Sequence, residues 1–209
     1  MKIPSLEEAT AFVVDAEGRN PGPWISHSLF VARAAEAIAR AHPNLDPQAA
    51  FILGYLHDIG RREGMTHMHH ALDGYTFLAR QGYEDAGRIC LTHSFPIKDY
   101  RAVVGNWDGC TPVELAFIQE YLDRMEYNIY DKLIQLCDAL ALPSGYCIIE
   151  KRLVDVTLRY GMNEYTLPRW KALLGLQHEF ERAIQKSIYD CLPGVMENTL
   201  KVNLLSNGN

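Results

Sequence analysis

The stretch Tyr55-Leu56-His57-Asp58-Ile59-Gly60 places two polar residues at the end of a run that is otherwise apolar. Residues 47–56 before it are apolar nearly all round, which is typical of a helix buried at the centre of a protein. Asp46 and Pro47 suit the start of this helix, and Gly60 suits its end. We therefore expect a central helix whose chain turns near Gly60, so that the side chains of His57 and Asp58 approach one point.

The sequence around this helix predicts further helices and little else. A capping box at Ser5–Glu8 starts the first one. Alternation typical of strands is scarce, and no Asn-Gly or Asp-Gly hairpin is flanked by alternating residues. The predicted fold class is therefore all-α, and the chain is expected to form one domain over 1–209. Within it we expect a core at about 24–141, a C-terminal helical extension at about 143–205 and a frayed tail at 206–209. The other helices are expected at about 24–41, 66–81, 84–93, 112–125, 128–141, 146–160 and 168–190.

Histidines fall on the inward faces of two of these helices. His27 shares the apolar face of helix 24–41, and His93 shares that of helix 84–93, because the apolar residues recur with helical spacing. Asp138 is a carboxylate within the apolar run 133–140. Buried without a partner it would cost several kcal/mol, roughly, so it needs a cation or strong donors.

Helix 66–81 carries adjacent histidines that must point in different directions. His69 lies on the polar face and is expected to be solvated, whereas His70 lies on the inward face. His67, one turn before His70, is the reserve candidate for an inward role.

Composition and charge narrow the function classes. The chain has 209 residues, a net charge of -6, eight histidines and five cysteines. The acidic balance argues against nucleic-acid polymers and anionic membranes as partners. The cysteine count is odd and includes no C-x-x-C pair, which is typical of proteins in a reducing compartment. The sequence also shows no basic and apolar leader and no apolar run of about 20 residues, so we expect a cytoplasmic protein. The oligomeric state stays open.

The inward residues together indicate a metal centre. Each alone also fits a core or capping role, but His27, His57, His70, His93, Asp58 and Asp138 come from five helices. Four imidazoles and two carboxylates suit borderline first-row metals rather than a thiolate zinc site. Six ligands exceed the needs of one catalytic metal with open positions, so they indicate two metals and a bridging carboxylate.

In this order, His27, then His57-Asp58-Ile59-Gly60, then Asp138 resemble the H…HD…D pattern of the HD-domain metal-dependent phosphohydrolases, with the HDIG form intact. His70–Gly74 resembles the H-x-x-x-G element of the dinuclear subfamilies, and His93 resembles their next histidine. The resemblance covers about residues 24–140. Two features depart from the family pattern. Arg61 stands where many relatives have Lys. Ser94-Phe95-Pro96 replaces the G-Y-P element of the cyclic-di-GMP phosphodiesterases, which argues against cyclic-di-GMP as the substrate.

The resemblance implies a helical bundle with metals at its middle. His27, His57, Asp58 and Asp138 would hold the first ion, and His70, His93 and Asp58 the second, with Asp58 bridging. The expected cofactors are two divalent ions, Fe or Mn in preference, with Zn, Co, Ni and Mg as alternatives. The implied activity is hydrolysis of a phosphate ester or anhydride by metal-activated water, with Asp58 and Arg61 as catalytic residues.

The expected substrate is a small phosphorylated molecule, by preference a nucleotide. Four basic residues follow the proposed ligands in the sequence and could bind the phosphate of this substrate. The other interpretation is that they are solvated surface charges, and we prefer this interpretation for two of the four. The four residues are Arg61, Arg62, Lys98 and Arg101. Two other functions stay open: a di-iron oxygenase with the same ligands, as in proteins resembling myo-inositol oxygenase, and a non-catalytic nucleotide-binding regulatory module.

Overall fold

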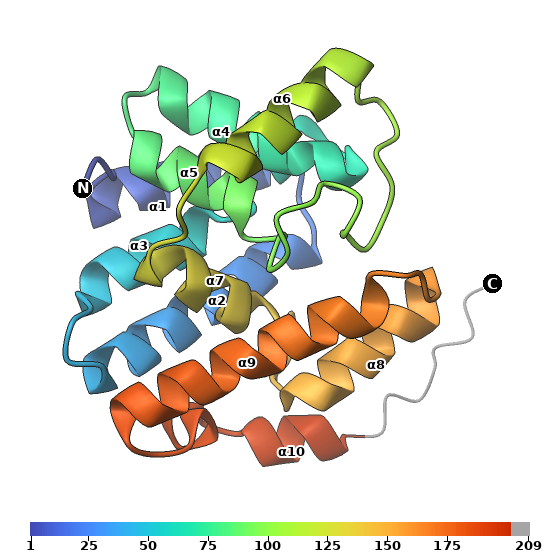
Figure 1. Cartoon of the computed structure of the whole chain (residues 1–209). Helices are drawn as coiled ribbons and strands as arrows, with labels where there is room; N and C mark the ends of the chain where they lie inside the picture. Colours follow the sequence, from blue (N-terminus) through green and yellow to red (C-terminus); the bar gives the residue numbers. More distant parts are fainter. Residues whose placement is uncertain (202–209) are drawn as a thin grey trace.

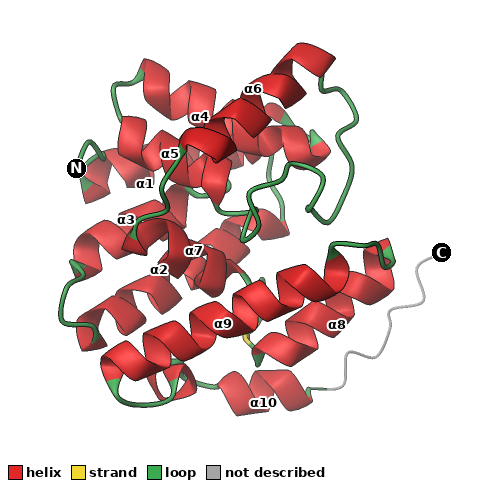
Figure 2. Ribbon diagram, in the orientation of Figure 1, coloured by secondary structure: helices red, strands yellow, loops and turns green. Residues whose placement is uncertain are grey.

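The computed structural model describes residues 1–201 of the chain, and these residues form an all-α fold (Figures 1 and 2). They contain ten α-helices, three short 3-10 helices and one two-stranded hairpin. The predicted fold class is confirmed. The tail predicted at 206–209 lies outside the described residues. Among those described, every helix is too short or too polar to span a lipid bilayer.

The helices begin close to where their capping residues predict. Asp46 accepts a hydrogen bond from the Ala49 amide, and Thr111 and Asn128 form capping boxes. The helices are α1 Leu6–Arg19, α2 Pro23–Ala41, α3 Pro47–Leu56, α4 His70–Arg80, α5 Glu84–Thr92, α6 Pro112–Arg124, α7 Ile129–Asp138, α8 Ile149–Tyr160, α9 Thr166–Ile184 and α10 Val195–Leu200.

The predicted start of α4 was wrong by four residues. Residues His67–His69 form a separate 3-10 turn, η2, because His67 has a positive φ of 47° that an α-helix does not allow. The helix therefore begins at His70, and the 3-10 turn Ile59–Glu63, η1, lies directly before this segment.

Two helix ends in the C-terminal half also differ from prediction. The helix expected to reach 141 ends at Asp138, and the antiparallel hairpin of Ala141–Leu142 (β1) and Gly145–Tyr146 (β2) follows. The helix expected to reach 190 ends at Ile184, because Gln185 adopts a left-handed conformation. A further 3-10 turn, η3 (Ile188–Cys191), and α10 were not predicted.

Helix α7 occupies the middle of the bundle and contacts α2, α3, α5 and α9. Leu133, Ile134 and Leu136 of α7 are fully buried. Helix α3 packs closely on α2 at Gly54, where a Cβ atom would lie 2.8 Å from the Ala32 Cα. The ends of α3 and α7 are thereby brought to the same region as the start of α2.

Helices α8, α9 and α10 lie together on one side of the bundle, with α9 crossing beside α7 and α2 (Figure 1). The division into a core at 24–141 and an extension at 143–205 within one domain stays a prediction. Residues of α8 and α9 form one side of the cavity described below.

Gly60 allows η1 to approach the start of α4 without a side chain between them. A Cβ atom at this position would lie 1.9 Å from the His70 carbonyl oxygen and 2.5 Å from the Gly74 amide nitrogen. Because both neighbours are backbone atoms, the Gly60→Ala variant must push η1 and α4 apart. We expect it to lose about 3 kcal/mol of unfolding free energy, seen in a thermal melt as a Tm lower by roughly 6–12 °C.

Gly18→Ala is the matched control for this variant. Gly18 lies within α1, and an added Cβ there meets nothing within 4 Å. This alanine should raise stability by about 0.5–1 kcal/mol, because it restricts the unfolded chain. Equal melting temperatures for the two variants would contradict the close approach at Gly60.

Candidate metal centre

The structure brings all six predicted metal ligands to one place, and they come from the ends or faces of five helices. His27 lies on the buried side of α2, and His57 and Asp58 follow the last residue of α3. His70 is the first residue of α4, His93 follows α5, and Asp138 ends α7. The chain leaves the α conformation at Asp58, which has φ -104° and ψ 13°, and this turn directs the His57 and Asp58 side chains to the same point as predicted.

One half of the cluster is formed around Asp138. Its Oδ1 lies 2.9 Å from His27 Nε2 and 4.0 Å from His57 Nε2. His57 Nε2 also lies 3.8 Å from Asp58 Oδ2, so His57 stands between the two carboxylates.

The other half is formed around Asp58. Its Oδ1 lies 3.0 Å from His70 Nε2 and 3.6 Å from His93 Nε2. Its Oδ2 accepts a 2.6 Å hydrogen bond from Arg61 Nε. Asp58 therefore has nitrogen atoms near both of its oxygens, those of His70 and His93 near Oδ1 and that of Arg61 near Oδ2.

Three of the imidazoles are held in the orientation that metal ligands require. His57, His70 and His93 each bond a backbone carbonyl through Nδ1, which fixes the proton there and leaves the Nε2 lone pair directed at the carboxylates. The accepting carbonyls belong to Gly54, His67 and Cys90. The distance is 2.8 Å for both His57 and His93.

Two buried polar atoms in the cluster lack hydrogen-bond partners among residues 1–201. They are His57 Nε2 and Asp58 Oδ1; the latter lies near His70 but without hydrogen-bond geometry. Leaving such an atom unsatisfied costs about 1–3 kcal/mol. A divalent cation would satisfy both atoms at once, so the residues present fit a metal.

Two groups within the cluster have ligand atoms close enough to share an ion. They are His27, His57 and Asp138, and His57, Asp58 and His93, each with ligand atoms within 4.8 Å of one another. His57 belongs to both groups. The predicted division, in which Asp58 is shared and His70 completes the second set, stays a prediction.

The protonation states suit metal binding. Burial raises the pKa of Asp58, but the charge of the Arg61 guanidinium, with the electrostatic effects of the neighbouring His57 and His70 rings, more than reverses this and holds the pKa well below its usual range. Burial, with the electrostatic effect of the neighbouring His57 ring, lowers the pKa of His93 to about 3. The carboxylate is thus ionised and the imidazole neutral at physiological pH, as ligands must be.

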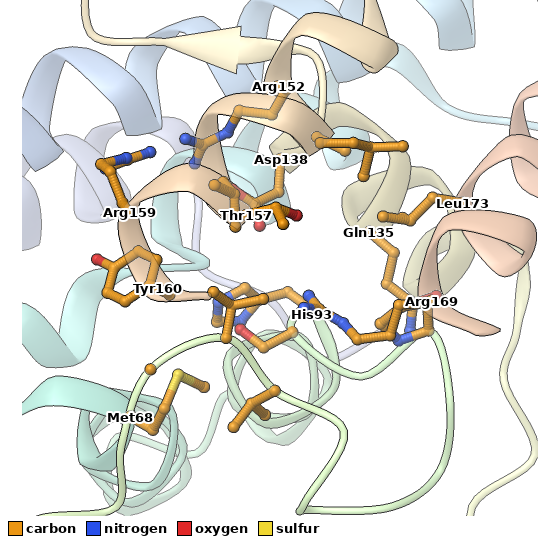
Figure 3. A pocket seen from close by; sticks show the side chains of 18 of the residues that line it. Met68, His93, Gln135, Asp138, Arg152, Thr157, Arg159, Tyr160, Arg169 and Leu173 are labelled. Atoms are coloured by element: carbon orange, nitrogen blue, oxygen red, sulfur yellow. The ribbon is translucent and has the colours of Figure 1, made fainter. Parts of the chain in front are cut away.

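Five of the six predicted ligands, all except His57, line a cavity of about 400 Å³ and form its floor (Figure 3). Helices α8 and α9 supply much of its wall. Four arginines line it, against the two carboxylates of Asp58 and Asp138. They are Arg61, Arg152, Arg159 and Arg169.

Of the four predicted phosphate contacts, only Arg61 lines this cavity. Arg62 is 8% exposed and points away from it: its guanidinium lies 4.0 Å over the Phe77 ring and donates to Asp15 at 2.5 Å. Its contacts join η1 to α1 and α4, which is a structural role.

Lys98 and Arg101 also lie outside the cavity lining. The Lys98 ammonium is 5.2 Å from the centre of the Tyr127 ring, and Arg101 forms an ion pair with Asp99 at 2.7 Å. Nothing in this arrangement supports the predicted contact of either residue with substrate.

Sequence reasoning missed Arg152, Arg159 and Arg169, because the helices that carry them resembled nothing known. One signal was present in α8: Arg152, Val156 and Arg159 recur at i, i+4 and i+7, so the two arginines share a face with an apolar residue. All three line the cavity.

The other histidines of this region have different roles. The His69 ring, expected in solvent, is partly buried between Asp73 at 2.9 Å and Glu114 at 3.4 Å, outside the metal cluster. His67, the reserve candidate, supplies a backbone carbonyl to His70 and belongs to neither candidate ligand group.

Comparison with known proteins agrees with this geometry. The model of the HD domain matches residues 24–142, which is more than half of the chain and contains all six proposed ligands. No curated protein and no solved structure gives a significant match. The match begins at α2 and ends in β1, so it leaves out the helices α8 and α9 that wall the cavity. By this match, and by the His and Asp cluster that it contains, the chain belongs to the HD-domain family of metal-dependent phosphohydrolases.

Proposed function

We propose that the protein hydrolyses a phosphate ester or anhydride of a small, nucleotide-like molecule at a dinuclear metal centre. The observation that carries this proposal is the floor of the cavity, where imidazoles anchored through Nδ1 direct Nε2 at Asp58. Two divalent ions, Fe or Mn by preference, would activate water and polarise the phosphoryl oxygens when bound. His27, His57, Asp58 and Asp138 would hold one of them, and His70, His93 and Asp58 the other.

Arg61 is placed to serve both the centre and the substrate. Its Nε donates to Asp58 Oδ2, and one Nη atom lies 3.5 Å from His70 Nε2. Burial lowers the pKa of Arg61, but the carboxylate of Asp58 outweighs burial and raises it, so the guanidinium stays charged. Arg61 therefore orients Asp58 and offers its other N–H groups to a phosphoryl oxygen, while a proton for the leaving group must come from elsewhere.

Charge and size support a small anionic substrate. The chain as a whole has a net charge of -6, yet four arginines face two carboxylates in the cavity. Its volume of about 400 Å³ lies in the range of small-molecule sites. A polymer would need a longer basic surface than one cavity of this size offers.

Aromatic residues support a nucleotide-like organic part. Trp24, Tyr160 and Trp170 line the cavity beside the polar floor. Aromatic rings stack on nucleobases, and this contribution tolerates different bases.

The proposal is tested by metal analysis of protein purified without added metal, followed by a phosphate-release panel of nucleotides and phosphoesters under air and without oxygen. We expect about two ions per chain and release of phosphate that does not depend on oxygen. Oxygen consumption coupled to substrate loss would replace the proposal with the di-iron oxygenase. Tight nucleotide binding with no turnover in any metal would replace it with a regulatory module.

A further inference from the structure

Three arginines on α8 and α9 face the cavity from beyond the part of the chain that matches the HD domain. Arg152 and Arg159 belong to α8, and Arg169 belongs to α9. Figure 3 shows Arg152 and Arg159 on one side of the cavity and Arg169 on the other, with Asp138 and His93 between them. Positive charge therefore lies on the side of the cavity that helices α8 and α9 build.

Arg169 has no partner for its charge among residues 1–201. Its Nε atom is buried without a hydrogen bond, and no carboxylate of the described chain lies within 4.0 Å of its guanidinium. Burial lowers its pKa to about 10, against an opposing effect of Asp138, so it remains charged at physiological pH. The Arg169 residue as a whole is half-buried and lines the cavity, so an anion bound there could pair with its charge and satisfy its buried Nε atom.

Arg152 and Arg159 are only partly compensated. Both approach the same carboxylate, Asp155, at 3.8 Å and 2.8 Å respectively. Asp138, the nearest acid on the floor, already contacts His27 at 2.9 Å. Two guanidinium groups thus share one outer carboxylate, Asp155, and the third, that of Arg169, has none within 4.0 Å in the described chain, so positive charge is in excess at the cavity.

We propose that Arg152, Arg159 and Arg169 form a second anion subsite, which holds a phosphate or carboxylate group that does not react. The scissile phosphoryl group lies at the metal centre beside Arg61, and this part of the inference rests on the proposed function. The substrate class is then a small molecule with two anionic groups. A substrate with a single phosphate would leave Arg169 unpaired and would bind more weakly.

The subsite is tested by binding rather than turnover, on metal-free protein, with non-hydrolysable probes. The probes are methylphosphonate, phosphonoacetate and alkylene bisphosphonates with linkers of one to four carbons. Calorimetry should show at least one two-anion probe binding ten times or more tighter than methylphosphonate, because charge-assisted contacts with arginine are strong. Preference for bisphosphonates or for phosphonoacetate identifies the second group as phosphate or carboxylate.

Arg169→Gln and, separately, Arg152→Gln should abolish this preference while methylphosphonate binding changes less than threefold. Arg182→Gln is the matched control, because Arg182 lies exposed on the same helix as Arg169 and outside this cavity. The inference is overturned if no two-anion probe is preferred, or if the preference survives in both variants. If the wild-type protein prefers a two-anion probe and both variants lose this preference, the subsite is supported even when the wild-type protein releases no phosphate. That result would reject the proposed hydrolysis alone.

Discussion

The Asp58→Asn variant is expected to lose metal and activity together. Asp58 contacts His70 and His93 through Oδ1 and Arg61 through Oδ2, and the proposed function makes it the carboxylate shared by both ions. An amide keeps the shape of the side chain but carries no charge, and its NH2 group cannot act as a ligand. We expect metal content to fall from about two ions per chain to less than one, and phosphate release to fall at least about a thousandfold.

Asp131→Asn is the matched control, because Asp131 is an equally buried carboxylate paired with an arginine. It is fully buried, accepts from Arg88 and Thr92, and lies on the same helix as Asp138. The substitution removes the negative charge that pairs with the Arg88 guanidinium and should cost about 3 kcal/mol of unfolding free energy. Metal content should stay at the wild-type value. An Asp58→Asn protein that keeps two ions and full turnover would remove Asp58 from the centre.

The ligands could be found in the sequence because helical periodicity decides which side chains point inward. His27 and His93 share their helix faces with buried aliphatic residues, and both are buried in the structure. The choice of His70 over His69 followed from the same argument and placed His70 in the cluster. These inferences needed only local information, since 3.6 residues per turn fixes the direction of each side chain once the helix exists.

What the sequence could not give depends on tertiary packing or on local breaks in the helix. Arg61 and Arg62 are adjacent and identical in type, yet η1 turns one toward Asp58 and the other toward Asp15. In a 3-10 turn, neighbours diverge by about 120°, so a shift of one residue in the turn exchanges their roles. No periodicity in five residues can fix that shift.

The cavity wall illustrates the same limit over a longer range. Arg169 becomes a cavity residue only because α9 crosses beside α7, and no pattern within α9 records that crossing. The close approach of Gly60 to the His70 backbone also depends on how η1 packs against α4. The sequence shows the glycine that follows His57 and Asp58, but not the backbone that it approaches. Identifying the cavity-lining residues of α8 and α9 therefore requires the packed structure, whereas identifying the proposed metal ligands does not.

The His70→Asn variant is expected to separate the second ion from the first. The Nδ1 atom of His70 donates a hydrogen bond to the His67 backbone carbonyl, and its Nε2 atom points at Asp58. Asparagine retains an N–H near the Nδ1 position, so the bond to the His67 carbonyl can persist, but it removes the Nε2 ligand. We expect metal content to fall from about two ions to about one and turnover to fall about a hundredfold.

His69→Asn gives the sharpest control for this test, because the two histidines are neighbours in the chain. His69 contacts Asp73 and Glu114, and neither of these lies in the metal cluster. The variant should keep two ions and wild-type turnover, although α6 loses one attachment through Glu114. A His70→Asn protein that still holds two ions would assign the second site to other ligands. A wild-type protein that holds only one would leave His70 as a substrate contact or core residue, because its Nε2 would then have no ion to bind.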